Sequence, residues 1–222
     1  VFNIAEGRGN SRNREAQVPA VLEMLNIPYS GSDPQCLSIC LDKPMTKKLV
    51  AAAGVPTPKW KVLTSNEQIR ELARDSFPFP VFLKPAHEGS SKGIHLGFRF
   101  ETPEPMIEVA TVLLGRYQQP VLAEEFIDGD EVTVGIVGNS SPKVIGIMRI
   151  LPRDKRQNFI YSLEVKRNWE ELVDYECPAQ LDADILERIT DFSLRAYETL
   201  GCRDFARLDF RVSPTGTPHF IE

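Results

Sequence analysis

Three segments in the middle of the chain have the composition of β-strands, and only short turns separate them. Apolar and β-branched residues dominate 121–126, 131–137 and 143–150. The connections contain Asp128-Gly129-Asp130 and Gly138-Asn139-Ser140, residue types that are typical of β-hairpins. Strands joined by such short turns pair antiparallel, because a parallel pair needs a crossover of about a dozen residues or more. The fold must therefore be built around an antiparallel sheet.

Helical patterns occur both before and after these strands in the sequence. Apolar residues recur at three- and four-residue intervals in 15–25 and in the long segment that ends near Leu200. Ser65 and Asp182 are suitable N-caps. The predicted helices are 15–25, 43–53, 66–74, 104–114 and 183–200; the further predicted strands are 1–5, 81–84, 93–98, 206–212 and 218–222, with a long irregular loop over 153–174. Strands that first alternate with helices and then pair antiparallel indicate an α+β or mixed α/β fold with two lobes.

Composition excludes several classes of partner. The 26 Lys and Arg residues against 31 Asp and Glu residues give a net charge of −5, which offers no electrostatic attraction for nucleic acid or a membrane surface. No apolar run approaches the roughly 20 residues of a membrane span. The four cysteines Cys36, Cys40, Cys177 and Cys202 match no zinc pattern, so we expect buried, reduced thiols in a cytoplasmic protein. Because apolar segments lie at both ends, we expect a fragment truncated at both termini.

The hairpin formed by 206–212 and 218–222 carries the first candidate site. Alternation along the strand places Arg207 and Asp209 on the face opposite Leu208, and Glu222 on the partner strand could share that face. Two carboxylates beside an arginine suit a hard divalent cation and leave the guanidinium to bind anionic oxygen. A solvated polar face with an Arg–Asp pair is the alternative, and from the residues alone it is the more common one.

A small polar loop carries the second candidate site. In Glu88-Gly89-Ser90-Ser91-Lys92-Gly93, backbone N–H groups and the hydroxyls of Ser90 and Ser91 could surround phosphate oxygens, with Lys84 as a cation at the end of the preceding strand. The loop matches neither the Walker nor the Rossmann glycine pattern. An ordinary hairpin connection is an equally good interpretation.

The third candidate site is the strand end Glu124-Glu125-Phe126-Ile127, followed by Glu131. Main-chain groups at a strand end can bind the edge of an adenine, and a carboxylate a few residues later can accept ribose hydroxyls. A hairpin with solvated acids is the alternative. Lys43, at the start of a predicted helix, is by itself a weak candidate.

Taken in order, these segments resemble the ATP-grasp family, and within it the D-alanine–D-alanine ligases. The resemblance covers nearly the whole chain. It rests on Tyr29-Ser30-Gly31-Ser32-Asp33, Leu41-Asp42-Lys43, Phe82-Leu83-Lys84-Pro85, Glu88 to Gly93, Glu124 to Glu131, Gly201-Cys202, Ala206-Arg207-Leu208-Asp209 and Phe220-Ile221-Glu222.

The resemblance implies an ATP-grasp fold in which two lobes grip ATP. It implies the end of a substrate domain over 1–42, a small lobe over 43–127 and a large lobe over 128–222. It also implies the following roles: Lys43, Lys84 and Lys166 bind phosphate; Glu88, Ser90 and Ser91 belong to the phosphate-covering loop, with Ser90 also catalytic; Glu124, Glu125, Phe126 and Ile127 surround adenine; Glu131 binds ribose; Asp209 and Glu222 ligate Mg²⁺; and Arg207 stabilises the oxyanion.

The implied reaction joins small amino acids in the cytoplasm during peptidoglycan biosynthesis. ATP converts a carboxylate to an acyl phosphate, which an amine then attacks. The family has a Lys-Tyr pair where this chain has Lys166-Arg167, and its further Mg²⁺ ligand, an Asn two residues after the last Glu, would lie beyond Glu222. A different amine acceptor and a non-catalytic nucleotide-binding module therefore remain alternatives, and a homodimer is left open. For the fragment we expect nucleotide binding with little turnover.

Overall fold

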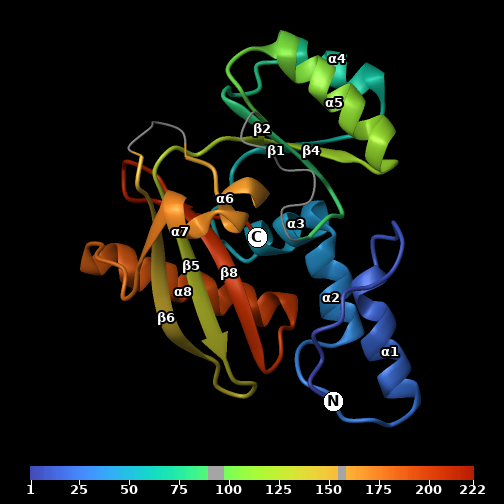
Figure 1. The fold of residues 1–222 in the computed structure, drawn as a ribbon, viewed down its shortest axis with the longest axis vertical. Coiled ribbons are helices and arrows are strands. Elements are labelled where there is room, and N and C mark those ends of the chain that lie inside the picture. The colour runs from blue at the N-terminus through green and yellow to red at the C-terminus, as the bar shows by residue number, and fades with distance from the viewer. Residues whose placement is uncertain (90–97, 155–158) are drawn as a thin grey trace. The chain divides into compact units, whose positions relative to one another are not determined.

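The computed structural model describes residues 1–89, 98–154 and 159–222. It divides into two compact units, each built around one antiparallel sheet (Figure 1). The first unit comprises Val1–Thr57, Asp128–Leu151 and Asp174–Glu222, and the second comprises Pro58–Ile127 and Pro152–Val173. Two sheets with packed helices confirm the predicted mixed α and β class. The three predicted domain ranges stay a prediction.

The sheet of the first unit has five strands in the order β7-β6-β5-β8-β9. The long helix α8 (Ala183–Leu200) covers one of its faces (Figure 1). The strands are β5 (Asp130–Val137), β6 (Lys143–Pro152), β7 (Val173–Glu176), β8 (Phe205–Val212) and β9 (Pro218–Phe220). Alternate residues of β5 and β8, among them Val134, Leu208 and Phe210, pack with Ile189 and Ala196 of α8 in the core. The predicted strands 131–137, 143–150 and 206–212 and the predicted long helix are thus confirmed. The hairpin predicted at Asp128-Gly129-Asp130 is wrong, because the strand before it, β4 (Val121–Glu125), belongs to the other sheet and β5 pairs with β6 and β8 instead.

The first unit also contains four helical segments near the N-terminus. They are the 3₁₀ turn η1 (Arg14–Ala16), α1 (Gln17–Met24), α2 (Pro34–Leu41) and α3 (Lys43–Ala52). The prediction missed α2, although its start follows known rules: Pro34 occupies the first turn, and the Asp33 side chain accepts a hydrogen bond from the Cys36 N–H over 2.9 Å.

The strand predicted over 1–5 is wrong. The N-terminal segment lies beside Ser30, whose N–H donates to the carbonyl of Val1 over 2.9 Å, but it forms no strand. The side chains of Phe2 and Ile4 are 72% and 81% exposed. An apolar pattern without a sheet edge to pair with is insufficient to make a strand.

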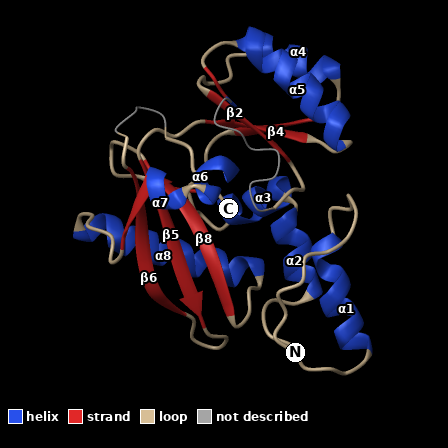
Figure 2. Cartoon of the chain, in the orientation of Figure 1, coloured by secondary structure: helices blue, strands red, loops and turns tan. Residues whose placement is uncertain are grey.

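The sheet of the second unit has the order β1-β4-β2-β3. Two helices pack on one of its faces (Figure 2). The strands are β1 (Trp60–Leu63), β2 (Val81–Pro85), β3 (Arg99–Phe100) and β4 (Val121–Glu125), and the helices are α4 (Asn66–Arg74) and α5 (Pro103–Tyr117). Most of the predicted strand 93–98 lies outside the described residues, but β3 does pair antiparallel with β2.

The loop predicted over 153–174 contains regular structure. The described part forms α6 (Leu163–Arg167), α7 (Trp169–Leu172) and the start of β7. Ser162 caps α6, since its hydroxyl accepts from the Val165 N–H over 3.4 Å. Helices of one turn are too short to show an apolar period, which is why the sequence did not predict them.

Membrane-spanning helices are absent from the part of the chain that the structure describes, since none of its helices combines the necessary length and apolarity.

The cap of α4 provides a test of the second unit. Ser65 is the predicted N-cap, and its hydroxyl accepts from the Gln68 N–H. Replacing Ser65 with Ala leaves the first turn of α4 without this acceptor, so we expect a loss of about 1 kcal/mol in the free energy of unfolding. Urea denaturation followed by circular dichroism measures it. Ser65→Asp, which restores an acceptor, is the control; equal stability of Ser65→Ala and the wild type would refute the cap.

Candidate active site

One face of the five-stranded sheet is polar where β5 and β8 pair. In the register of the two strands Thr133 lies opposite Asp209, and Glu131 lies opposite Arg211. The Thr133 hydroxyl donates to Asp209 Oδ1 over 2.7 Å, and Arg211 Nη1 donates to Glu131 Oε2 over 3.2 Å. The predicted alternation along 206–212 is confirmed, because the intervening residues belong to the core.

Glu222 reaches the strand residue Asp209 through a β-bulge. The N–H groups of Ile221 and Glu222 both donate to the Asp209 carbonyl, over 2.8 and 3.3 Å, and the Asp209 N–H donates to the Glu222 carbonyl over 2.7 Å. Strict alternation from the core residue Phe220 would turn Glu222 into the core, whereas a bulge redirects the side chain. The Glu222 side chain is accordingly 44% exposed, so its carboxylate stays accessible next to the main chain of Asp209.

Lys43 meets the carboxylate of Glu222 from the start of α3. Asp42 caps this helix, accepting from the Met45 N–H over 3.2 Å. The Lys43 side chain is only 4% exposed, and its Nζ donates to Glu222 Oε1 over 2.5 Å. A buried ammonium needs a partner of this kind, because removal from water otherwise disfavours its charge. The ion pair therefore fixes a cation beside an expected metal ligand.

Arg207 lies on the same strand as Asp209. Its Nη2 donates to Asp209 Oδ2 over 3.1 Å, while its side chain is 63% exposed. The residue opposite Arg207 on β5 is Gly135, which has no side chain to cover it. A guanidinium held in this way presents N–H donors in a fixed planar geometry, which suits carboxylate and phosphate oxygens.

The donor set around Asp209 and Glu222 fits a hard cation. Mg²⁺ prefers carboxylate oxygens and is usually held by one or two of them together with phosphate oxygens of a substrate. The structure joins the main chains of the two acids, and the hydroxyl of Thr133 fixes one oxygen of Asp209. Mg²⁺ therefore suits the residues present.

In the second unit Lys84 forms a buried ion pair. Lys84 lies near the end of β2 and Glu124 near the end of β4, and these strands pair antiparallel. The Lys84 ammonium contacts the Glu124 carboxylate, and the two side chains are 3% and 4% exposed. Breaking a buried pair by removing one partner is costly, so the ammonium is held in a defined position.

A residue outside the predicted site, Gln119, holds the start of the predicted phosphate loop by hydrogen bonds. Gln119 is buried; its Nε2 donates to Glu88 Oε1 over 2.8 Å, and its Oε1 accepts from the His87 N–H over 2.6 Å. The Gln119 side chain thus fixes the position of the Glu88 carboxylate. Ser90 and Ser91 lie outside the described residues. No local sequence signal marks Gln119, because it acts only through the fold.

The predicted adenine segment follows β4. The N–H of Glu125 donates to the Lys59 carbonyl over 2.9 Å, and the N–H of Phe126 donates to the Pro80 carbonyl over 2.8 Å. Phe126 is 8% exposed, and the guanidinium of Arg99 lies 4.9 Å from the centre of its ring. Phe126 therefore helps to build the unit. The adenine role of the segment, including Ile127, stays a prediction.

Lys166 lies on α6 in the second unit. Its Nζ lies 5.1 Å from the ring centre of Tyr161, a cation–π geometry. Arg167, which stands where the resembled family has a tyrosine, is exposed. Tyr161 precedes α6 and supplies an aromatic ring beside the lysine, and no sequence motif marks it as a site residue.

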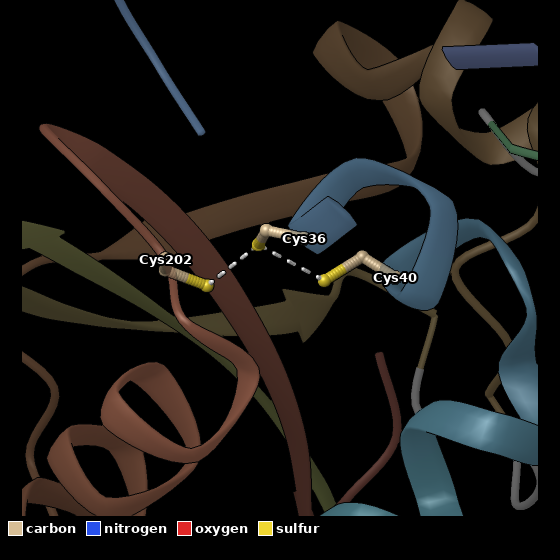
Figure 3. Close-up of side chains that lie close together, drawn as sticks. All are labelled: Cys36, Cys40 and Cys202. Atoms are coloured by element: carbon tan, nitrogen blue, oxygen red, sulfur yellow. Dashed lines mark hydrogen bonds between the residues drawn. The ribbon is translucent and has the colours of Figure 1, made fainter. Parts of the chain in front are cut away.

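Three of the four cysteines gather, which the sequence did not predict. Cys36 Sγ lies 3.8 Å from Cys40 Sγ and 3.7 Å from Cys202 Sγ (Figure 3). Hydrogen bonding with Cys202, and then with Cys40, lowers the pKa of the Cys36 thiol. Hydrogen bonding with Cys202, and then with Cys36, raises the pKa of the Cys40 thiol. Cys177 is exposed, so the expectation that all four thiols are buried is wrong.

The candidate residues therefore fall into two sets. The first unit holds Lys43, Glu131, Arg207, Asp209 and Glu222, and the second holds Lys84, Glu88, Glu124, Glu125, Phe126, Ile127 and Lys166. Within these sets the structure brings together Lys43 with Glu222, Arg207 with Asp209, and Lys84 with Glu124.

The chain is similar to solved structures of ligases. It aligns with the VanG D-Ala:D-Ser ligase from Enterococcus faecalis at a TM-score of 0.74 and 27% identity, covering 93% of this chain and 58% of that one. It aligns with a D-alanine–D-alanine ligase from Bacillus anthracis complexed with ATP at a TM-score of 0.70 and 26% identity, covering 93% of this chain and 62% of that one. The predicted ATP-grasp fold is thereby confirmed.

Sequence comparison agrees with the structural comparison. The chain is 35% identical over 216 residues to a D-alanine–D-alanine ligase of Methylibium petroleiphilum, covering 93% of this chain and 63% of the relative. It is 31% identical over 222 residues to an uncharacterized protein of Sinorhizobium fredii, covering 100% of this chain and 63% of the relative. The chain thus spans less than two thirds of the length of these relatives. A family model described as D-ala D-ala ligase C-terminus matches residues 49–222, and the chain belongs to the D-alanine–D-alanine ligase family.

Proposed function

We propose that this protein is an ATP-dependent ligase that forms an amide bond between two small amino acids, as a D-alanine–D-alanine ligase does. The observation that carries the proposal is the β-bulge that joins Asp209 and Glu222 beside the cations Lys43 and Arg207. A magnesium nucleotide needs carboxylates for the cation and positive charge for the phosphates, and this cluster offers both.

The proposal gives the candidate residues the following roles toward ATP. Lys43, Lys84 and Lys166 bind phosphate oxygens, and Glu88, Ser90 and Ser91 belong to the loop that covers the phosphates. Glu124, Glu125, Phe126 and Ile127 surround the adenine, and Glu131 accepts the ribose hydroxyls. Two features support this assignment: the burial of Lys84 with Glu124, and the ion pair that holds Glu131 against Arg211.

Asp209 and Glu222 would hold Mg²⁺ in the proposed site. When bound, the cation supplies positive charge that neutralises the phosphate oxygens. Thr133 orients the Asp209 carboxylate through its 2.7 Å hydrogen bond, and Lys43 orients the carboxylate of Glu222 through its 2.5 Å hydrogen bond. These two residues therefore act as positioning residues for the pair of acids.

The proposed reaction has two steps. A carboxylate oxygen of the first amino acid attacks the γ-phosphorus of ATP, so that an acyl phosphate forms and ADP leaves. The amine of the second amino acid then attacks the acyl carbon, phosphate leaves, and the amine loses a proton to solvent or a base. Arg207 donates hydrogen bonds to the oxyanion that develops on the acyl oxygen, and Ser90 contacts the substrate.

A different amine acceptor is the second candidate. Arg167 is exposed where the resembled family has a tyrosine, and a cation there would favour an anionic or larger acceptor. The likeness to a structure named as a D-Ala:D-Ser ligase is in keeping with variation of the acceptor among relatives.

The proposal further includes the domain ranges 1–42, 43–127 and 128–222, a cytoplasmic location and a role in peptidoglycan biosynthesis.

The metal site gives the main test of the proposal. The complete product of the open reading frame should release phosphate from MgATP when D-alanine is added. Asp209→Asn should lower kcat/KM at least about 100-fold, because replacing a ligand costs more than the 10- to 100-fold typical of outer partners. A coupled phosphate assay and mass spectrometry of the products measure both.

Asp184→Asn, the same chemical change at an exposed position at the start of α8, is the control and should retain activity. Phosphate release without any amide product, or no response to a panel of D- and L-amino acids, would reject the ligase. Tight MgATP binding without turnover would favour the non-catalytic module.

Arg207 gives a test of the oxyanion role. Arg207→Ala removes a donor to a charge that exists mainly in the transition state, so kcat should fall about 100- to 1,000-fold. The Kd for MgATP, measured by calorimetry, should change by only a few fold. Arg188→Ala on α8 removes a partly exposed arginine elsewhere and should leave both constants unchanged. A loss confined to the Kd would show that Arg207 binds nucleotide instead.

A further inference from the structure

The three clustered thiols come from segments that are far apart in the sequence. Cys36 and Cys40 lie one turn apart on α2, so their side chains share one face of that helix. Cys202 follows the end of α8, where Gly201 has a positive φ of 70° and the chain turns toward β8. The three sulfur atoms lie within 4.8 Å of one another (Figure 3).

The fold holds these segments together by contacts on either side of the thiols. The Arg203 N–H donates to Ser32 Oγ over 3.0 Å, and the Arg203 guanidinium lies 2.8 Å from Asp33 Oδ2. The Cys202 N–H donates to the Tyr197 carbonyl over 3.0 Å at the end of α8. The backbone around the thiols is therefore fixed from both directions, so the cluster is preformed.

The sulfur spacing matches a metal site. A tetrahedral Zn²⁺ with Zn–S bonds of about 2.3 Å separates its sulfur ligands by about 3.8 Å. The two shortest separations, 3.7 and 3.8 Å, have this value, whereas a disulfide requires about 2.05 Å. A cation can thus enter with only a small adjustment of the third distance.

A cavity lies beside two of the three cysteines, Cys36 and Cys202. It measures about 650 Å³ and is lined in part by Cys36, Cys202, Asp33, Asn139 and Arg203. A cation bound by three thiolates would have a fourth position facing this space, where water or an external ligand can bind. Arg203 lies on the cavity wall and offers positive charge to offset an excess of thiolate charge.

We propose that Cys36, Cys40 and Cys202 bind a thiophilic divalent cation of the Zn²⁺ type, with a fourth coordination position open to the cavity. The site ties α2 to the segment between α8 and β8. Each thiol would release its proton when the cation binds, and those protons pass to the buffer. The proposal concerns residues other than those of the proposed ligase site and does not depend on that function.

Small apolar packing is the competing explanation. Cys40 and Cys202 are partly buried and pack against the hydrophobic core of the first unit, as cysteines often do without any ligand. Thiols in ordinary non-bonded contact also approach to about 3.5–4.0 Å, so the two printed separations fit both explanations. The convergence of three thiols from two distant segments beside a cavity is the observation that favours a cation. The two explanations differ in what the chain does when a thiophilic cation is added.

The test is a titration of the reduced 222-residue chain with Cd²⁺ in the absence of oxygen. A thiolate-to-metal charge-transfer absorption should rise and saturate at a single Cd²⁺ per chain, and a large excess of Zn²⁺ should compete with Cd²⁺ and lower this absorption. Cys40→Ser and Cys202→Ser should each weaken Cd²⁺ binding at least about 100-fold, since they remove a ligand. Cys177→Ser, which removes the exposed cysteine, is the matched control and should bind as the wild type does.

A second measurement on the wild type does not depend on the folding of variants. Alkylation with iodoacetamide, read by peptide mass spectrometry, should modify Cys177 with or without Zn²⁺, whereas Zn²⁺ should protect Cys36, Cys40 and Cys202. Equal alkylation of all four thiols in the presence of Zn²⁺, or no charge-transfer band, would overturn the proposal. A Cys36–Cys202 disulfide in the isolated chain, with no Cd²⁺ binding after reduction, would identify a redox pair instead.

Discussion

The antiparallel pairing of β5 with β8 is the constraint on which the first unit depends. Val134 and Leu208 face each other on the core side, and next to them Thr133 and Asp209 face each other on the polar side. Because side chains alternate with a period of two, a slip of one residue would turn Asp209 into the apolar core. Burying an unpaired carboxylate is far more costly than losing an apolar contact, so the core and the polar face select the same register.

The bulge after the end of β9 allows Phe220 to point into the core while Glu222 points away from it. Phe220 must point inward, where it packs edge-on against Phe210 with ring centres 5.7 Å apart. Regular pairing would then turn Glu222 inward as well. An extra residue opposite Asp209 breaks the alternation after Phe220, and the carboxylate of Glu222 meets the ammonium of Lys43. Apolar packing and the polar cluster are thus compatible only because the pairing is irregular there.

Local rules account for what the sequence predicts well. The helix α4 has its predicted bounds, since a cap, a polar first turn and an apolar period all coincide between Ser65 and Arg74. The alternation in β8 is equally local. Contacts between distant segments are not encoded in this way: Lys84 and Glu124 were expected as separate ligands, and their ion pair follows from the register of β2 with β4.

The thiol cluster shows why the remaining contacts escape prediction. Its spacing along the chain matches no metal pattern, because the third ligand arrives through the packing of α2 beside the end of α8. That packing also has a consequence for the polar cluster. Cys40 lies shortly before Lys43, and Cys202 shortly before Arg207 and Asp209. A cation bound by the three thiols would therefore restrain two chain segments, the one that leads to Lys43 and the one that leads to Arg207 and Asp209. Because both connections are short, little chain length is left to absorb a movement of the thiols.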